Sequence, residues 1–352
     1  MNKYLQNISF QEPTNLEFIK RLTTPTGILQ HTKFAIPDRF EGYCVDDNAR
    51  ALLLTIRDHE IFQKHQSLNL ALIYLSYISH SRTPEGWFFT YQDFDHKFRK
   101  DTDQDAFGRA IWALGYTVYT NLRWDVAKEA ERVFNQALTN FTKLKYTRAK
   151  AYTLLGCLYF QQSASKNDVL EKITLDLALE LESMYEKNSN ATWAWFEGSL
   201  TYDNALLPLV MIKSYQYFKK DSFLRIGVES LGFLESQSRH AGVPSPIGNN
   251  GWLKEGTQKA IWDQQPIDVC TMVMANAEAY RTLRAENYLS SAKEWFSWFH
   301  GFNLKEKSLY DPSTGGCFDG LNSDGVNMNQ GAESTLVYWL AYLELVDLLK
   351  ES

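Results

Sequence analysis

Helical periodicity runs through almost the whole chain and constrains the fold more than any other feature. Apolar residues recur every three or four positions in long segments, which is the spacing of one face of an α-helix. These segments predict helices at 47–64, 68–80, 105–121, 125–144, 147–162, 168–186, 203–219, 222–239, 268–283, 286–300 and 333–350, with a weaker one at 16–21. The sequence therefore predicts an all-α protein.

The connections between these helices alternate in length. Helices that begin at residues 47, 105, 147, 203 and 268 are each followed within a few residues by a second helix, which makes five helical hairpins. The N-terminal helix is the candidate to close a sixth pair with the last helix. Long loops precede most of the first helices, at 22–46, 81–104, 187–202, 241–267 and 301–332, and only 145–146 is short.

The two helices of each predicted hairpin differ in character. First helices are apolar over most of their circumference, as in 49–54 and 272–277, and such helices are buried. Second helices are amphipathic and charged, as in 127–133 and 168–173, which suits an outer layer. An inner ring of six helices wrapped by an outer ring satisfies both observations. We therefore expect an (α/α)6 toroid, a single domain over residues 1–352 with its long loops over one face.

An open helical solenoid is the rival architecture, since it also repeats pairs of helices. Solenoid repeats hold a nearly constant period, whereas the spacing here runs from about 45 to 65 residues because the loops carry insertions. The toroid is therefore the favoured interpretation.

Composition narrows the classes of partner. A net charge of −6 without a basic stripe argues against nucleic acid, and no segment approaches the ~18 apolar residues of a membrane span. The N-terminal residues lack the apolar core of a signal peptide, which predicts a cytoplasmic location. Four widely spaced cysteines show no metal or redox spacing, so we expect free buried thiols, no metal and no cofactor.

Two adjacent carboxylates, Asp46 and Asp47, stand where a long loop enters a helix. A single acid at a helix start is an ordinary N-cap, but one cap does not need two acids. Capping alone is the favoured role for Asp203 and Asp268. Other predicted helix entrances carry acids as well: Asp103, Asp105, Asp203, Asp263, Asp268 and Glu333.

Two arginines, Arg50 and Arg109, stand one turn into inner helices behind these acids. We expect them to orient the acids by ion pairing.

Aromatic and polar side chains recur in the long loops, which the toroid would gather at one mouth. Flat rings can stack on the C–H faces of sugars, while carboxylates and amides bind the hydroxyls, so this mixture favours a carbohydrate ligand. The predicted substrate-binding residues are Arg50, Trp87, Asp103, Asp105, Arg109, Trp193, Trp195, Asp203, Trp262, Gln265, Asp268 and Glu333.

Cleavage of a glycosidic bond needs two carboxyl groups, one as acid and one as nucleophile or base. The candidate catalytic residues are Asp46 and Asp47, with Glu197 and Asp263 as partners across the ring. A helix N-terminus favours an ionised Asp47, whereas a glutamate beside aromatic rings, such as Glu197, is suited to the acid role.

The segment Asp46-Asp47-Asn48-Ala49, followed by an apolar helix, resembles the double-aspartate motif of the endo-α-1,6-mannanase family among the six-hairpin glycosidases. The resemblance implies that the two consecutive aspartates are the catalytic pair. The aromatic residues that usually follow them in that family are replaced here by Arg50 and Ala51.

A second resemblance rests on the segments 24–31, 42–51 and 200–207, which are similar to helical domains that accompany glycosyltransferases in bacterial chains. It implies only a carbohydrate setting and no specific reaction, and it makes a glycosyltransferase a candidate protein partner.

The leading hypothesis is a glycoside hydrolase that acts on an oligosaccharide or polysaccharide. A sugar epimerase or polysaccharide lyase on the same fold is an alternative, although such enzymes generally use His or Tyr for proton transfer and only His31 and His96 clearly fall in the loops. A noncatalytic glycan-binding module that accompanies a glycosyltransferase is the other alternative.

Overall fold

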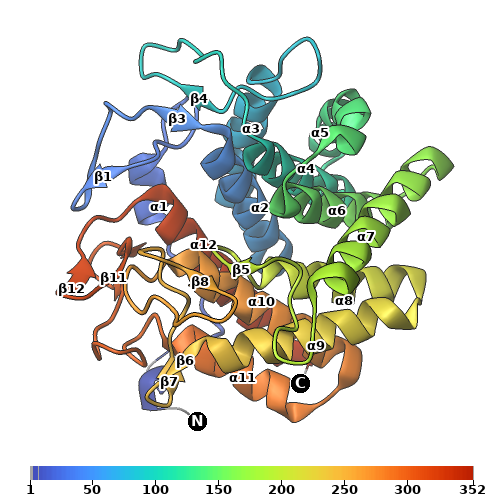
Figure 1. The fold of residues 1–352 in the computed structure, drawn as a ribbon. Helices are drawn as coiled ribbons and strands as arrows, with labels where there is room; N and C mark the ends of the chain where they lie inside the picture. Colours follow the sequence, from blue (N-terminus) through green and yellow to red (C-terminus); the bar gives the residue numbers. More distant parts are fainter. Residues whose placement is uncertain (1–2, 7, 352) are drawn as a thin grey trace. The chain divides into compact units, whose positions relative to one another are not determined.

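The computed structural model describes residues 3–6 and 8–351, and within them the chain is mainly helical. Each helix predicted from periodicity is present. The helices are α1 Glu17–Leu22, α2 Val45–Phe62, α3 His65–His80, α4 Gln104–Thr120, α5 Trp124–Ala137, α6 Thr147–Gln161, α7 Asp168–Asn188, α8 Leu206–Phe218, α9 Asp221–Gln237, α10 Pro266–Leu283, α11 Glu286–Ser297 and α12 Ala332–Glu351 (Figure 1).

Four boundaries differ from the prediction by more than two residues. Helix α3 begins at His65, three residues before the predicted start at residue 68. The helix predicted over 125–144 is α5 followed by a 3₁₀ segment, Leu138–Lys143. Helix α8 begins at Leu206, three residues after Asp203, and α11 ends at Ser297 instead of His300. Helix ends are the least reliable part of a sequence-based assignment because local capping decides them.

The chain forms two compact units. The first-half unit is Ile19–Glu180, and the second-half unit combines Met1–Phe18 with Leu181–Ser352. Each unit is described by itself below, and the single domain over 1–352 stays a prediction.

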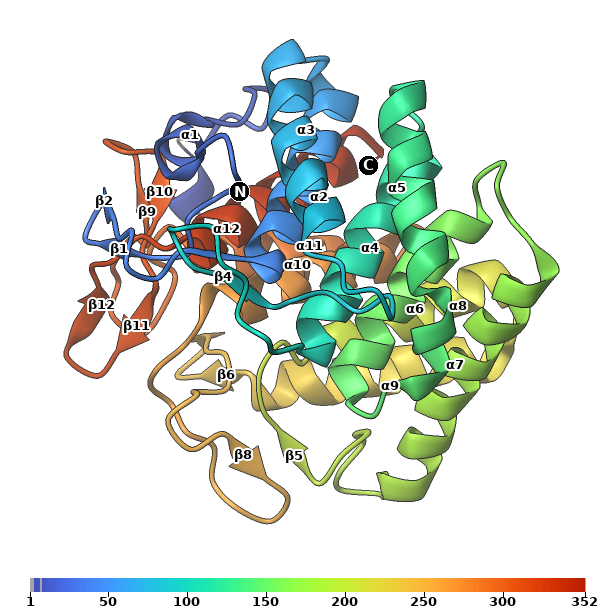
Figure 2. The ribbon, with the colours of Figure 1, turned by 90° about the horizontal axis from the view of Figure 1, so that it is seen from above.

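In the first-half unit, α2 packs against α4 and α4 packs against α6, while α3 covers α2 and α5 covers α4 (Figures 1 and 2). Most residues of α2, α4 and α6 are buried around the whole helix, whereas α5 buries one face, at Val126, Ala127, Ala130, Val133, Phe134 and Ala137. This confirms the predicted difference between first and second helices.

The second-half unit repeats the arrangement. Helices α8, α10 and α12 form a row in which α10 lies in the middle, and α9 and α11 pack on α8 and α10. Helix α10 is buried at every residue from Pro266 to Tyr280. In both units the buried row therefore belongs to the first helices of the predicted hairpins, joined in the second-half unit by the last helix, α12.

Short antiparallel strands occur in the loops. Their pairs are β1 Thr32–Lys33 with β2 Ile36–Pro37, β3 Tyr43–Cys44 with β4 Tyr91–Gln92, β5 Ser199–Leu200 with β8 Leu253–Lys254, β6 Arg239–His240 with β7 Val243–Pro244, β9 Tyr310–Asp311 with β10 Gly316–Cys317, and β11 Gly320–Asn322 with β12 Gly325–Asn327. The β3–β4 pair joins the loop before α2 to the loop before α4. A side chain at position 42 would collide with the Gln92 carbonyl oxygen, 2.3 Å from an added Cβ, so the glycine is needed there.

Cys44, Cys157, Cys270 and Cys317 are free and buried, as expected from their spacing. Among the described residues, no helix combines the length and apolar character that a membrane crossing requires.

Candidate active site

The start of α2 places Asp46 and Asp47 in its first turn, after an N-cap that neither aspartate provides. Cys44 is the N-cap: its backbone is extended and its Sγ accepts the Asp47 N–H at 3.3 Å. The Cys44 thiol in turn donates to Asp47 Oδ2 at 3.2 Å. The capping role that the sequence offered to one aspartate is therefore taken by Cys44, and both carboxylates are left for other partners.

Two arginines hold these carboxylates. Arg50 Nη1 donates to Asp46 Oδ2 and to Asp47 Oδ1, both at 2.9 Å. Arg109 Nη1 reaches from α4 to both oxygens of Asp46, at 2.8 and 3.0 Å. The expected ion pairing of Arg50 is confirmed. Arg109 was expected to orient the acids at the start of its own helix, α4. In the structure it pairs with Asp46 and so connects α4 to α2.

The shared nitrogen of Arg50 limits the separation of the two carboxylates. Asp46 Oδ2 and Asp47 Oδ1 are no further apart than twice 2.9 Å. Retaining glycosidases hold their two carboxyl groups at about 5–5.5 Å. These two oxygens are therefore closer together than the ~6.5–9.5 Å that separates the carboxyl groups of inverting enzymes.

The charge state of Asp46 follows from its neighbours. Burial raises the pKa of the carboxyl group, but the positive charges of Arg109 and Arg50 and their hydrogen bonds outweigh burial and lower the pKa below its ordinary value. The Asp46 side chain keeps 21% of its surface exposed, whereas Asp47, Arg50 and Arg109 are buried. Asp46 is thus an ionised carboxylate that a ligand can reach.

Two more groups complete the surroundings of the pair. Asn48, which is fully buried, accepts the Ile28 N–H at 3.1 Å and donates to the Cys44 carbonyl at 2.8 Å, so it ties the preceding loop to the helix start. Tyr91 is half-buried on β4, and burial together with the groups of Cys44 and Asp46 raises the pKa of its hydroxyl. The sequence did not predict the roles of Cys44, Asn48 and Tyr91 in the site, because these roles depend on contacts between segments.

The entrance to α4 carries Asp103 and Asp105. Asp103 is exposed and caps the helix, accepting the Ala106 N–H at 2.9 Å, while Asp105 is buried in the first turn. Trp87 packs on Phe107 of α4, with ring centroids 4.8 Å apart. The structure therefore brings Asp46, Asp47, Arg50 and Arg109 into direct contact, and Asp103 acts as a helix cap.

In the second-half unit, two of the predicted acids adopt a left-handed backbone. Asp203 has φ 45° and is buried three residues before α8, and Asp263 has φ 64° in the loop before α10. Gln265 Nε2 donates to Asp263 Oδ1 at 2.8 Å. Asp268 lies in the first turn of α10, where its Oδ1 accepts the Asn204 N–H at 3.4 Å. The N-cap positions of α8 and α10 are Ala205 and Gln265, so the expected capping by Asp203 and Asp268 is wrong.

The aromatic candidates of this unit divide into core and surface. Trp195 is fully buried against Phe196, and Trp193 is buried with its indole N–H bonded to the Glu197 carbonyl at 2.7 Å. Large rings gain most from burial, which explains why these loop tryptophans pack inward. Trp262 is partly exposed beneath Lys305, whose Nζ lies 4.5 Å from the ring centroid. Glu197 and Glu333, the latter in the first turn of α12, are also partly exposed.

The predicted pairing of Asp46 with Glu197 or Asp263 joins residues of different units and stays a prediction.

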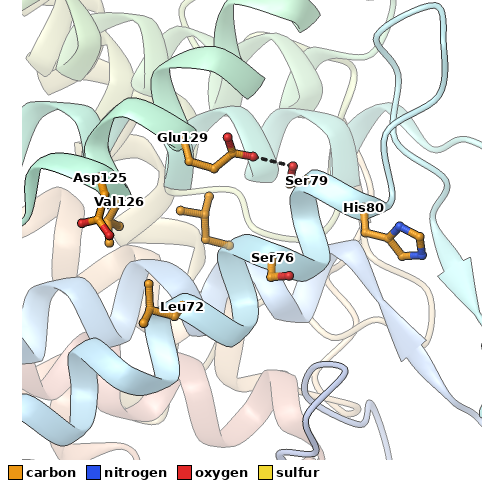
Figure 3. Close-up of a pocket in the computed structure, with 8 residues that line it drawn as sticks. Leu72, Ser76, Ser79, His80, Asp125, Val126 and Glu129 are labelled. Carbon is orange, nitrogen blue, oxygen red and sulfur yellow. Dashed lines mark hydrogen bonds between the residues drawn. The ribbon is translucent and has the colours of Figure 1, made fainter.

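A groove between α3 and α5 in the first-half unit lies outside the predicted site (Figure 3). It holds about 520 Å³ and its acids are paired: Glu129 with Ser79 and Arg132, and Asp125 with Arg123. The lining residues are Leu72, Leu75, Ser76, Ser79, His80, Asp125, Val126 and Glu129. In the described part of the chain, no three His, Cys, Asp or Glu side chains are grouped so that they could hold a metal ion.

Comparisons with known proteins give matches in structure only. No protein-family model matches the chain, and a search of curated proteins found no significant relative. Cellobiose 2-epimerase from Bacillus thermoamylovorans is similar with a TM-score of 0.76 and 10% identity, over 96% of each chain. A sugar epimerase from a ruminal bacterium has a TM-score of 0.74 and 12% identity, over 96% of this chain and 95% of that chain.

A family 76 α-mannanase from Bacteroides thetaiotaomicron is similar with a TM-score of 0.69 and 13% identity, over 99% of this chain and 98% of that chain. At such identities a structural match establishes the fold, and function has to be argued from the site. The fold class is the predicted one, an all-α (α/α)6 toroid.

Proposed function

We propose that this chain is a carbohydrate-active enzyme that hydrolyses a glycosidic bond in an oligosaccharide or polysaccharide. The observation that carries the proposal is Asp46, an accessible carboxylate held between Arg50 and Arg109 where a loop enters a buried helix. Glycoside hydrolysis needs one carboxylate that is ionised at neutral pH, as nucleophile or as the base that activates water. The two arginines supply that charge state.

The same geometry supports a narrower proposal for the roles than the sequence does. A general acid needs a raised pKa so that it holds a proton at neutral pH, and Asp46 has the opposite shift. Asp46 is therefore proposed as nucleophile or base. The general acid is proposed to be one of the other candidate carboxyl groups, Asp47, Glu197 or Asp263.

The structural neighbours are compatible with this proposal. An α-mannanase is among them, and the α-mannanase resemblance of the Asp46-Asp47 segment points to the same chemistry. The substrate class proposed is a neutral glycan, because the accessible Asp46 carboxylate can accept hydrogen bonds from sugar hydroxyls and the half-buried Tyr91 ring lies near it.

Sugar epimerisation is the second candidate, and the specific observation in its favour is the match to two epimerases at TM-scores of 0.74 and 0.76. An epimerase moves a proton at a carbon atom and breaks no glycosidic bond. The two candidates therefore differ in their products. Glycan binding without turnover beside a glycosyltransferase stays a prediction from the sequence.

The test is a product assay on a panel of mannan, cellulose and other oligosaccharides, with reducing-end detection and proton NMR of the sugars. New reducing ends support hydrolysis, an epimerised sugar supports the second candidate, and an unchanged panel contradicts both. For a responsive substrate, Asp46→Asn should lower turnover by about 10²- to 10⁴-fold because the essential charge is lost.

Asp125→Asn is the matched control. Asp125 also lies in the first turn of a helix and pairs with an arginine, Arg123, but it is on the outer helix α5. Its replacement should leave turnover unchanged. Full activity in Asp46→Asn would remove Asp46 from the mechanism.

A further inference from the structure

Tyr152 lies beneath the arginine that binds Asp46. It belongs to α6, only 1% of its surface is exposed, and the Arg109 Cζ atom lies 4.4 Å from the centre of its ring. Trp112, one turn after Arg109 on α4, stacks on the same ring at 6.0 Å with the planes 19° apart. Arg109 is therefore in contact with a buried aromatic ring as well as with the Asp46 carboxylate.

Glycines at the interface of α4 and α6 place the ring there. A Cβ at Gly115 would lie 2.1 Å from the Gly156 carbonyl oxygen, and one at Gly156 would lie 2.4 Å from the Ile111 carbonyl oxygen. A Cβ at Gly108 would lie 2.9 Å from Tyr152 Cβ. The two backbones thus approach closely along the whole interface, which brings Tyr152 within reach of Arg109.

The Tyr152 hydroxyl does not explain why a tyrosine stands at this position. The oxygen is buried, and in the part of the chain that the structure describes it has no hydrogen-bond partner. The contact with Arg109 is made by the ring. A guanidinium over the face of a desolvated aromatic ring is attracted by the electron-rich face and is held in one orientation.

We propose that Tyr152 is a positioning residue for the catalytic carboxylate: its ring fixes the Arg109 guanidinium, and Arg109 in turn holds both oxygens of Asp46. The proposal rests on the proposed function for its catalytic meaning, while the placement of Arg109 can be tested independently. Both Arg109 and Tyr152 are buried, so water does not replace the lost ring contact at low cost. Without the ring, the guanidinium gains alternative orientations and the ionised form of Asp46 is favoured less.

The first experiment follows Arg109 by NMR in protein labelled with nitrogen-15 arginine, with the signal assigned from Arg109→Lys. Wild type and Tyr152→Phe should show a slowly rotating guanidinium with resolved Nη signals. Tyr152→Leu should average or lose these signals. An unchanged Arg109 spectrum in Tyr152→Leu overturns the positioning role, whether or not the enzyme hydrolyses a glycan.

The second experiment measures the pH profile of kcat/KM on the substrate identified by the product assay. The acid limb should move to higher pH by about 0.5 to 1 unit in Tyr152→Leu and stay in place in Tyr152→Phe, because only the former loses the ring. Loss of the NMR signals in Tyr152→Leu together with an inactive wild type would refute the proposed function and leave the positioning of Arg109 intact.

Phe160→Leu is the matched control for lost packing. Phe160 is a fully buried ring on the same helix that stacks on Phe134 at 4.3 Å. Phe160→Leu should destabilise the protein but leave the Arg109 NMR signals and the pH profile unchanged. A shift of the acid limb in Phe160→Leu would overturn the specific role of Tyr152. Should Tyr152→Leu not fold, Tyr152→Met removes the aromatic face with less loss of volume and is expected to give the same two changes.

Discussion

Asp46 of the first-half unit and Glu235 of the second-half unit are two carboxylates with nearly equal exposure and different surroundings. Their side chains are 21% and 19% exposed, and both are bound by several donors. Asp46 receives two guanidinium groups in the first turn of α2. Glu235 lies near the end of α9, where Oε1 accepts Asn276 Nδ2 at 2.8 Å, Ser291 Oγ at 2.5 Å and Trp295 Nε1 at 2.8 Å.

The difference shows that the number of hydrogen bonds does not identify a reactive carboxylate. The donors to Glu235 Oε1 are neutral and come from α10 and α11, so this oxygen joins three helices. Its one guanidinium partner, Arg239, lies further away, at 3.4 Å from Oε2. The donors to Asp46 are charged and set its ionisation, and its helix start adjoins a long loop. A structural carboxylate and a candidate catalytic carboxylate therefore differ in the charge of their main hydrogen-bond donors and in their position in the fold.

The largest stability effect is expected from Glu235→Ala. The substitution leaves the indole N–H of Trp295, a fully buried residue, without its acceptor and removes the contacts to Asn276 and Ser291. We expect the free energy of unfolding to fall by about 3 kcal/mol, measured by urea denaturation followed by circular dichroism. Glu235→Gln keeps an oxygen acceptor and should cost about 1 kcal/mol.

Turnover of a responsive glycan in Glu235→Gln should equal that of wild type. If Glu235→Gln lowered turnover without lowering stability, Glu235 would take part in function, and the distinction between Asp46 and Glu235 would be wrong.

The helices could be predicted from the sequence, whereas the contacts of the site could not. Periodicity is a local property, so α2, α4 and α10 follow from the spacing of their apolar residues. The pairing of Arg109 with Asp46 joins residues 63 positions apart and depends on how α2 packs on α4. The same holds for Tyr152, for which the only sequence signal is the set of glycines Gly108, Gly115 and Gly156 on the two facing helices.

For the tryptophans, the sequence suggested a binding role for a residue that lies in the core. A loop position suggested that Trp195 binds sugar, but its ring is fully buried beside Phe196. Composition cannot tell an aromatic ring that contacts ligand from one that fills the core, because both roles use the same large apolar surface. The acids at helix entrances were similarly ambiguous, since Asp103 caps α4 while Asp46 and Asp47 leave that role to Cys44.

The next effect is a pH dependence that belongs to the second-half unit. Burial among Phe296, Tyr310 and Tyr338 lowers the pKa of His300 to about 4 from its ordinary 6.5. Because the unfolded chain binds this proton below pH 6.5 and the folded chain does not until about pH 4, stability is lost as pH falls through that window. The loss amounts to at most about 3 kcal/mol.

His300→Phe should remove this part of the loss between pH 7 and pH 4.5, as measured by urea denaturation at each pH. His240, exposed on β6, provides the control, and His240→Phe should retain the pH dependence of wild type. An unaltered pH dependence in His300→Phe would show that other groups cause the acid sensitivity.

The smallest effects are expected from two glycine substitutions, which compare the same change in the two units. Gly156→Ala forces α4 and α6 apart, since the new Cβ would meet backbone atoms of Ile111 and Trp112, and should cost about 1–3 kcal/mol. Gly232→Ala on α9 meets no atom within 4 Å and lies exposed, so better helix propensity should stabilise the protein by about 0.5–1 kcal/mol. Urea denaturation measures the change in stability of both variants.

Because the close approach of α4 and α6 also places Tyr152 under Arg109, Gly156→Ala should disturb the NMR signals of the Arg109 guanidinium, and Gly232→Ala should not. Equal stability changes of the same sign in the two variants would mean that the close approach of α4 and α6 does not constrain the site.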